Sequence, residues 1–240
     1  MDAYGEFAFL YDELTSDVNY SLFFSYIKQI LEKNNCEPQL VLELACGTGS
    51  LTKLLAKEGY DVIAADRSEQ MLSVAREKCP DVLFLEQDMT SFELYGTVDL
   101  ILCMLDSVNY VTDKRKLLSM FRLVNNYLNP GGLFLFDINS PHYLKKVIGN
   151  NTFVEETDRI FYVWDNECKK DRVHFYLTFF VKEGQAYRRF DEVHTERIYQ
   201  QQEILDLLEK SGLNPLAVYG DFTFEKPRKN ADRIFFLAGK

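Results

Sequence analysis

Segments typical of buried β-strands alternate with segments typical of amphipathic helices between residues 40 and 138. The expected strands cover residues 40–45, 61–66, 82–85, 98–104 and 133–138, and the helices between them cover residues 48–58, 68–78 and 113–128. Parallel strands need crossover connections of this kind, and the crossover helices cover both faces of the sheet. The sequence therefore predicts an α/β fold with a doubly wound, mostly parallel sheet.

The pattern changes after residue 143, where apolar and polar residues alternate one by one. The three segments of this kind cover residues 153–166, 172–182 and 186–199. Their Phe, Tyr, Val and Thr residues favour strands, and the alternation predicts an antiparallel sheet with one solvated face.

Flanking elements complete the predicted core. A helix over residues 21–34, capped by Ser21, precedes the first strand. A helix over residues 200–210 and a pair of strands over residues 216–222 and 233–238 close the chain. We expect residues 1–143 and 200–240 to form one core, and residues 144–199 to be an antiparallel insert.

Charge and composition narrow the classes of partner. The formal net charge of −10 disfavours a broad nucleic-acid groove, because phosphates are bound through Lys and Arg. The N-terminus lacks a signal-peptide pattern, and no apolar segment reaches membrane-spanning length. The five cysteines are widely spaced without a CxxC pair, which argues against a zinc site or a disulfide framework. We expect a cytoplasmic protein without a membrane partner.

A glycine-containing turn, ELACGTG, follows the first expected strand. Gly47 and Gly49 allow the backbone to approach a ligand closely, although an ordinary tight turn is an equal alternative. Asp66 ends the second strand, where a carboxylate can accept both ribose hydroxyls; the alternative is a charge at a helix N-terminus. Asp88, followed by Met89, comes after the third strand and could accept an adenine amine, or could be a loop carboxylate.

The type of nucleoside ligand follows from what the turn lacks. A dinucleotide fingerprint requires a third glycine at the position of Thr52, and a P-loop requires a lysine after Gly49. A site without that lysine suits an adenosine that carries no phosphate chain, as in S-adenosylmethionine.

These motifs together, ELACGTG, Asp66, QDM at residues 87–89 and LNPGG before a strand, resemble the class I S-adenosylmethionine-dependent methyltransferases over roughly the whole chain. AFLYDEL, DSVNY and FDINSPH resemble a bacterial group of small methyltransferases, with an insert similar to that of glycine N-methyltransferase-like enzymes. The resemblance implies a seven-stranded Rossmann-like sheet with one antiparallel strand near its edge. It also implies that a three-stranded antiparallel insert after strand five forms a lid over the methyl acceptor.

The resemblance also implies a set of cofactor-binding residues: Tyr11, Glu43, Ala45, Gly47, Gly49, Asp66, Arg67, Met71, Asp88, Met89, Met104, Leu105 and Asp106. Glu43 would lie near the methionine amino group, Tyr11 would close over the cofactor, and residues 104–106 would border the methylthio centre. Two positions depart from the pattern, since many relatives have an apolar residue in place of Arg67 and glycine in place of Ala45.

Methyl transfer from a sulfonium needs a protein base only when the acceptor arrives protonated. His194 and His142 are the candidate bases, and the alternative for each is a side chain that faces solvent or its neighbours. The charges around His194, Glu196 among them, are expected to be exposed to solvent. No Pro-Pro-aromatic motif of base-methylating enzymes follows the fourth strand.

The sequence thus predicts a methyltransferase that uses S-adenosylmethionine to methylate nitrogen or oxygen of a small molecule, without a metal. The alternatives are the same fold acting on RNA or protein, a non-catalytic module that binds the cofactor, and a nicotinamide dehydrogenase. The acceptor and the oligomeric state are left open.

Overall fold

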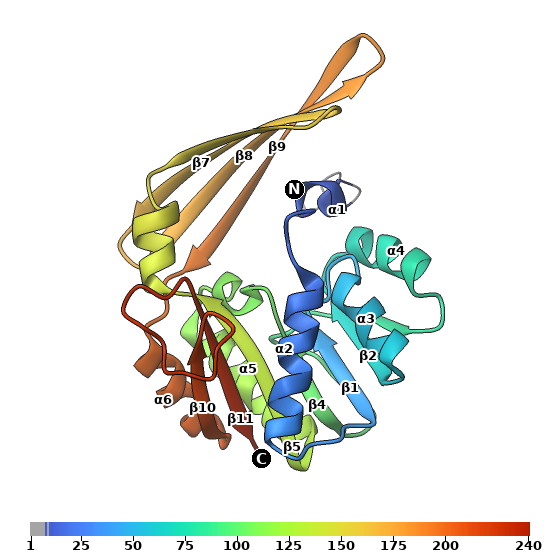
Figure 1. Ribbon diagram of the computed structural model, residues 1–240, viewed down its shortest axis with the longest axis vertical. Coiled ribbons are helices and arrows are strands. Elements are labelled where there is room, and N and C mark those ends of the chain that lie inside the picture. Colours follow the sequence, from blue (N-terminus) through green and yellow to red (C-terminus); the bar gives the residue numbers. More distant parts are fainter. Residues whose placement is uncertain (1–7, 9) are drawn as a thin grey trace.

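The computed structural model describes Ala8 and residues 10–240, which form two β-sheets with flanking helices (Figure 1). The first sheet has seven strands in the order β10-β11-β5-β4-β1-β2-β3. Their bounds are β1 Leu40–Leu44, β2 Asp61–Asp66, β3 Leu83–Glu86, β4 Val98–Cys103, β5 Leu128–Asn139, β10 Asn214–Gly220 and β11 Arg233–Gly239. Strand β11 is antiparallel to both β10 and β5, and the pairs from β5 to β3 are parallel. The prediction of a doubly wound, mostly parallel sheet is confirmed.

Helices cover both faces of this sheet. Their bounds are α1 Tyr11–Leu14, α2 Tyr20–Lys33, α3 Ser50–Glu58, α4 Glu69–Lys78, α5 Lys114–Tyr127 and α6 Gln201–Ser211, with short helical turns η2 at Ser107–Tyr110 and η3 at Tyr143–Ile148. Apolar residues of α2, α3 and α4 pack on one face, and those of α5 and α6 pack on the other. Strand β4 serves both cores, because Leu100 and Leu102 face the first layer while Ile101 and Cys103 face the second.

Two local features differ in detail from the sequence prediction. Helix α2 is capped by Asn19, whose Oδ1 accepts a hydrogen bond from the amide of Leu22 at 2.9 Å, so Ser21 lies inside the first turn. Strand β5 begins at Leu128, five residues earlier than expected, and its pairing with β4 is irregular through the segment that contains Gly131. The predicted cap of α4 is confirmed, since Ser68 Oγ accepts a bond from the amide of Met71 at 3.3 Å.

The second sheet is antiparallel and has four strands, where the sequence predicted three. The strands are β6 Thr152–Glu156, β7 Ile160–Lys169, β8 Arg172–Glu183 and β9 Ala186–Arg197. The extra turn lies between β6 and β7, where Thr157 Oγ1 accepts hydrogen bonds from the amides of Arg159 and Ile160. A threonine turn needs neither glycine nor proline, so the sequence carries no conspicuous break at this point.

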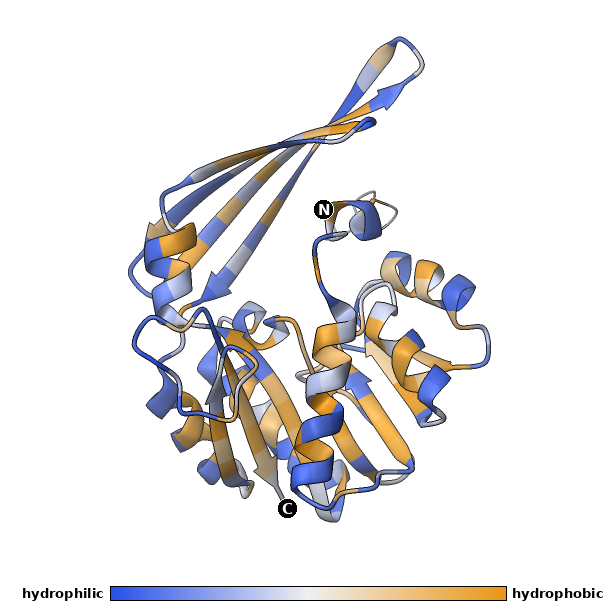
Figure 2. Cartoon of the chain, viewed as in Figure 1, coloured by the Kyte–Doolittle hydropathy of each residue, from blue (hydrophilic) through white to orange (hydrophobic). Residues whose placement is uncertain are grey.

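The antiparallel sheet arches over the edge of the seven-stranded sheet, with α1 between the two (Figure 1). Its strands alternate hydrophilic and hydrophobic residues, whereas the strands of the seven-stranded sheet are hydrophobic through most of their length (Figure 2). Within the described part of the chain, no helix is both long enough and apolar enough to cross a membrane.

Candidate functional site

The strand order reverses between β1 and β4, so the carboxyl ends of these neighbouring strands point to a natural crevice. A cavity of about 910 Å³ lies at this edge, within the usual range of about 300–1,000 Å³ for small-molecule sites. Its walls come from the strand ends, from α1 and from the inner face of the antiparallel sheet. Twelve of the thirteen predicted cofactor-binding residues line it: Tyr11, Glu43, Ala45, Gly47, Asp66, Arg67, Met71, Asp88, Met89, Met104, Leu105 and Asp106.

The turn after β1 has a left-handed backbone at Ala45 and at Gly47, both with φ of +55°. At Gly47, a Cβ would meet no protein atom within 4 Å, so glycine here leaves open space beside the cavity. Ala45 adopts the same φ with a Cβ, at a cost of about 1–2 kcal/mol, which explains why glycine is the easier residue at this position. The backbone conformation of this turn is therefore not that of a helix or a strand, and it is suited to the cavity that the turn borders.

Gly49 does not line the cavity. It precedes α3 with φ of +75°, and a Cβ on it would approach Ala75 Cβ of α4 to 3.0 Å. Because Gly49 has no side chain, the turn can pack closely against α4. Gly49 therefore supports the cavity wall from behind and does not form part of it.

Asp66 ends β2 beside the turn and fixes it. Its two carboxylate oxygens accept hydrogen bonds from the amides of Gly47 and Ser68, each at 2.9 Å. Burial raises the pKa of Asp66, and these amide bonds oppose the rise. Arg67 is exposed at the rim, while Met71 is buried on the first turn of α4.

Glu43 lies under the turn with 4% of its surface exposed. Thr52 Oγ1 donates a hydrogen bond to its Oε2 at 2.6 Å. Burial raises its pKa to about 8, and the nearby charge of Asp66 adds to the rise. A buried carboxyl of this kind gains most from a cationic partner.

The loops after β3 and β4 supply two further walls. Asp88 is exposed and its Oδ1 accepts bonds from the amide and hydroxyl of Thr90, each at 2.7 Å. Leu105 and Asp106, after β4, both have left-handed backbones with φ of +60° and +52°. This turn is held in place, because Asp137 accepts hydrogen bonds from the backbone amides of both residues at 2.8 and 3.0 Å.

Asp137 and Arg233 form an ion pair, with the carboxylate fully buried and the arginine partly buried, that sequence reasoning missed. Asp137 is fully buried on β5, and Arg233 at the start of β11 bonds to it and, at 2.9 Å, to Asp106. The partners are far apart in sequence, so no local pattern could reveal them. The pair fixes the turn that carries the three predicted residues at the end of β4.

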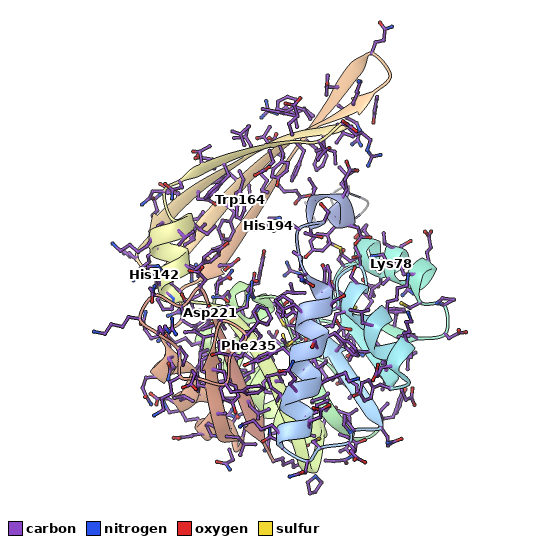
Figure 3. The ribbon with its side chains drawn as sticks, in the orientation of Figure 1. Lys78, His142, Trp164, His194, Asp221 and Phe235 are labelled. Carbon is purple, nitrogen blue, oxygen red and sulfur yellow. The ribbon has the colours of Figure 1, made fainter. Side chains whose placement is uncertain are left out.

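Helix α1 closes one side of the cavity and places Tyr11 in its wall. Asp12 accepts a hydrogen bond from Thr48 Oγ1 at 2.6 Å and pairs with Lys78 at 2.5 Å. Lys78 lies by the helices next to the turn (Figure 3). On its other side, Glu13 pairs with Arg159 of the antiparallel sheet at 2.8 Å.

The two candidate histidines occupy different environments. His194 projects from β9 into the cavity and is 7% exposed, and Figure 3 shows it on the side of the antiparallel sheet that faces α1. Burial lowers its pKa to about 4, and the charge of Arg67 lowers it further. The imidazole is therefore neutral near pH 7. His142 precedes η3, is partly exposed and does not line the cavity, so it is not brought together with His194.

Glu196 was expected to be solvent-exposed, and the structure corrects this expectation. Its side chain is 3% exposed and lines the cavity. The signal that could have found it is the period of two along β9, because residues 194 and 196 lie on the same face of the strand. Burial raises its pKa well above the usual range, and the charge of Asp106 adds to the rise.

Acidic side chains dominate the described wall of the cavity. Nine carboxyl groups line it: Glu13, Asp17, Glu43, Asp66, Asp88, Asp106, Asp113, Glu155 and Glu196. The basic side chains are Arg67, Lys116 and Arg233. Arg233 is paired with Asp106 and with Asp137, and burial raises the pKa of Glu43 and of Glu196 toward the neutral form. The other six carboxyl groups still outnumber Arg67 and Lys116, so the field in the cavity favours cations.

Comparison with known proteins gives consistent results along the chain. Residues 41–132 match a family described as a methyltransferase domain. A protein of Bacillus subtilis (strain 168) called "Putative methyltransferase YqeM" is 36% identical over 99% of this chain and 97% of its own length. A dTDP-3-amino-3,4,6-trideoxy-alpha-D-glucopyranose N,N-dimethyltransferase of Streptomyces venezuelae is 24% identical over 79% of this chain and 81% of its own length.

A solved structure agrees over the whole fold. An S-adenosylmethionine-dependent methyltransferase from Clostridium acetobutylicum ATCC 824 superposes with a TM-score of 0.90 at 38% identity, covering 98% of each chain. Both the extent of this match and the strand-end cavity fit the resemblance that the motifs indicated. The chain belongs to the class I S-adenosylmethionine-dependent methyltransferases, and its cofactor is S-adenosylmethionine.

Proposed function

We propose that this protein transfers the methyl group of S-adenosylmethionine to the nitrogen of a small-molecule amine that carries no phosphate. The supporting observation is one continuous cavity in which the strand-end residues share the same space with Glu196 and the aromatic inner face of the antiparallel sheet. A space of about 910 Å³ has room for a nucleoside cofactor and a small acceptor together.

The cofactor would occupy the part of the cavity below α1. Asp66 would accept hydrogen bonds from the ribose hydroxyls, and Asp88 and Met89 would meet the adenine edge. Glu43 would lie near the amino group of the methionine portion, where a cation relieves the cost of its burial. Among the described lining residues no basic side chain belongs to the turn from Ala45 to Gly47, which suits a ligand without a phosphate chain.

The acceptor would enter between the antiparallel sheet and the loops after β4 and β5. The inner face of that sheet presents aromatic side chains to the cavity: Tyr162, Trp164, Phe175 and Phe179. These rings would pack against the carbon skeleton of the acceptor and exclude water. Trp164 Nε1 is buried and has no hydrogen-bond partner among the described residues, so it is a donor suited to an acceptor oxygen. We infer that residues 144–199 act as a lid.

The charge of the cavity favours an amine and disfavours a phosphate. The Streptomyces venezuelae relative is named for an amino sugar linked to a nucleotide, which is an amine with a diphosphate. In this chain the described cavity wall has three times as many acidic as basic side chains, so a diphosphate would meet net repulsion. The nitrogen chemistry of that relative supports the proposal, whereas its phosphate does not suit this cavity.

The bound cofactor supplies an activated methyl group on a sulfonium that is already a good leaving group. The chain's own residues would then position the acceptor nitrogen and exclude water, which are effects that can supply much of the acceleration. Tyr11 on α1 and the turn at residues 104–106 both border the cavity and would hold the reacting groups in line.

The experiment that tests the proposal uses cofactor with a trideuterated methyl group. The protein is incubated with a metabolite extract, with glucosamine and with a nucleotide-linked amino sugar, and glucose serves as the matched hydroxyl control. We expect a mass gain on the nitrogen of an amine lacking phosphate, found by mass spectrometry. Label on oxygen, RNA or protein would overturn the assignment. Cofactor binding without transfer to any acceptor would favour a non-catalytic module.

A further inference from the structure

We propose that Glu196 binds the acceptor amine and takes the proton that the amine must lose before methylation. This assignment rests on the amine acceptor proposed above. It moves the role of base from His194, which the sequence favoured, to a carboxyl group two residues further along the same face of β9.

Glu196 is built into the acceptor side of the cavity. It lies one residue from the end of β9, lines the cavity and is 3% exposed, so an ion on this side chain has little access to bulk water. A buried carboxyl without a cation on it is costly to ionise. An ammonium group entering the cavity would supply the missing charge.

Neighbouring amides hold the Glu196 side chain in place. Asn139 at the end of β5 donates a hydrogen bond from its Nδ2 to Glu196 Oε2 at 3.2 Å. Asn109 in turn accepts a bond from the amide of Asn139 at 3.0 Å and donates to the carbonyl of Arg197 at 2.9 Å. The carboxyl is thus fixed between the two sheets, at the point where the strand-end loops meet the inner face of the antiparallel sheet.

The ionisable groups around Glu196 come from four elements. They are Asp106 before η2, Asp137 on β5, Tyr143 on η3 and Arg233 on β11, with His194 on β9 itself. Arg233 forms ion pairs with Asp106 and Asp137, so its positive charge is largely neutralised by these two carboxylates. Burial and the charge of Asp106 both raise the pKa of Glu196.

The two candidate bases differ in proton affinity. His194 has a pKa of about 4, so it would have to take a proton from an ammonium group whose pKa is about 8–10. That transfer is strongly uphill. The pKa of Glu196 is shifted in the opposite direction, toward that of the amine, which is the condition for efficient general-base catalysis.

The proton balance of the step is simple. Glu196 must be ionised to act, so a proton that burial holds on it passes to water when the ammonium group binds. An ammonium beside the carboxylate then has the same total charge as a neutral amine beside a carboxylic acid. Burial penalises the charged pair, so the proton moves from nitrogen to a Glu196 oxygen and the nitrogen lone pair becomes free. The nitrogen–carbon bond then forms as the carbon–sulfur bond breaks, with its electron pair leaving on sulfur. The product leaves as a methylated ammonium ion that keeps the two remaining nitrogen-bound protons, and Glu196 then releases its proton to water.

The first test compares Glu196→Gln with wild type on the amine acceptor found in the labelling experiment. The glutamine can still accept the Asn139 bond, so the fold should be kept. We expect kcat/KM near pH 7 to fall by about 100-fold. The loss should shrink as the pH rises and the amine deprotonates in solution. A role limited to structure would lower the rate equally at every pH.

Asp191→Asn is the matched control, since Asp191 is an exposed carboxylate on the opposite face of the same strand. It should leave the rate and its pH profile unchanged. A Glu196→Gln variant with wild-type cofactor affinity, rate and pH profile would overturn the proposal.

The second test measures binding alone and needs no turnover. Wild-type protein saturated with S-adenosylhomocysteine is titrated with n-propylammonium and with 1-propanol, and followed by NMR. We expect the ammonium to bind about tenfold more tightly, with the preference lost in Glu196→Gln. Equal affinity, or no binding of the ammonium to wild type, would overturn the assignment.

The two tests separate this inference from the proposed function. If no amine is methylated but the ammonium preference depends on Glu196, the acceptor proposal fails and the cation site stands. If an amine is methylated at the same rate and pH profile by Glu196→Gln, the acceptor proposal stands and the assignment of Glu196 fails.

Discussion

The two sheets of this protein bury their residues in different ways. The seven-stranded sheet is covered on both faces, and five of the six β4 residues are buried. The antiparallel sheet is covered on its inner face only, so β9 alternates exposed residues with less exposed ones along much of its length. Figure 2 shows this contrast as continuous orange strands below and mixed strands above.

The difference teaches where each half of the site comes from. The proposed cofactor half is built from turns at the ends of buried strands, so its residues follow from the position of each strand in the chain. The proposed acceptor half is built from side chains on the inner face of a sheet that is covered on one side only, where buried apolar residues such as Phe175 and Phe179 alternate along the chain with exposed ones. The residues proposed for the cofactor can therefore be read from the sequence, whereas those proposed for the acceptor depend on which side chains face inward.

The largest expected effect comes from the ion pair that joins the seven-stranded sheet to the β4 turn. Arg233→Met leaves Asp137 fully buried without its counter-charge. Breaking a buried pair in this way costs about 3–5 kcal/mol, which corresponds to a Tm lower by roughly 6–20 °C. Calorimetry near pH 7 should show the loss, and the deficit should shrink toward acidic pH as Asp137 is neutralised.

Arg228→Met is the control for this substitution, because Arg228 is exposed in the loop before β11. It should change Tm by less than about 1 °C, as surface substitutions usually do. If Arg233→Met were as stable as Arg228→Met, the β4 turn would not depend on the buried pair, and the contrast between the sheets would weaken.

The next effect concerns the pH dependence of the free energy of unfolding. The folded-state pKa of Glu43, about 8, lies above its unfolded value, so the folded state holds its proton more tightly. Stability without cofactor therefore falls as the pH rises through this window. One proton is worth up to about 1.4 kcal/mol per pH unit, or about 3 kcal/mol from pH 5.5 to 8.

Glu43→Gln should remove the contribution of Glu43 to the pH dependence of the free energy of unfolding. The amide resembles the neutral acid and can still accept the hydrogen bond from Thr52. Denaturant unfolding at several pH values would measure it. A variant slope equal to that of wild type would mean that Glu43 is ionised in the folded protein without cofactor.

Much of the fold could be predicted from the sequence, because strands buried on both faces are short apolar runs bounded by turn residues. The turn at Gly47 and the acid at Asp66 were also predictable, since both follow from strand ends. The turn at Thr157 was not, because a side-chain oxygen replaces the glycine that usually marks a break. The sequence therefore predicted one strand where there are two.

The acceptor side was harder to predict. Glu196 and the exposed Asp191 are both acids on one amphipathic strand, and only the three-dimensional arrangement shows which face turns inward. Arg233 and Asp137 pair across neighbouring strands that are distant in sequence. His142 follows β5 closely, yet the start of η3 carries it away from the cavity wall, which sequence proximity could not reveal (Figure 3).

A smaller expected effect concerns the cofactor half alone. Asp66→Ala should weaken S-adenosylmethionine binding about tenfold or more, because a charged hydrogen bond contributes roughly 1.5–3 kcal/mol and Asp66 also holds the Gly47 amide. Isothermal titration calorimetry would measure the affinity, with Asp61→Ala at the exposed start of the same strand as the control. Unchanged affinity would remove Asp66 from the cofactor site.

The smallest effect tests whether the two halves are coupled through α1, which contacts both. Glu13 pairs with Arg159 of the antiparallel sheet, and both side chains are partly exposed, so the pair is worth at most about 1 kcal/mol. Glu13→Gln should therefore speed amide exchange near Ile160 by up to about fivefold, measured by hydrogen exchange, and leave cofactor affinity within about twofold.

Asp12→Asn should do the reverse, because the described contacts of Asp12 are with Thr48 and Lys78 on the cofactor side. Glu183→Gln, at the exposed tip of the β8–β9 hairpin, should change neither quantity. If Glu13→Gln and Asp12→Asn alter exchange and affinity to the same extent, α1 transmits changes between the halves. If each variant alters only one of the two quantities, the contacts of α1 with the two sides of the cavity are independent of each other.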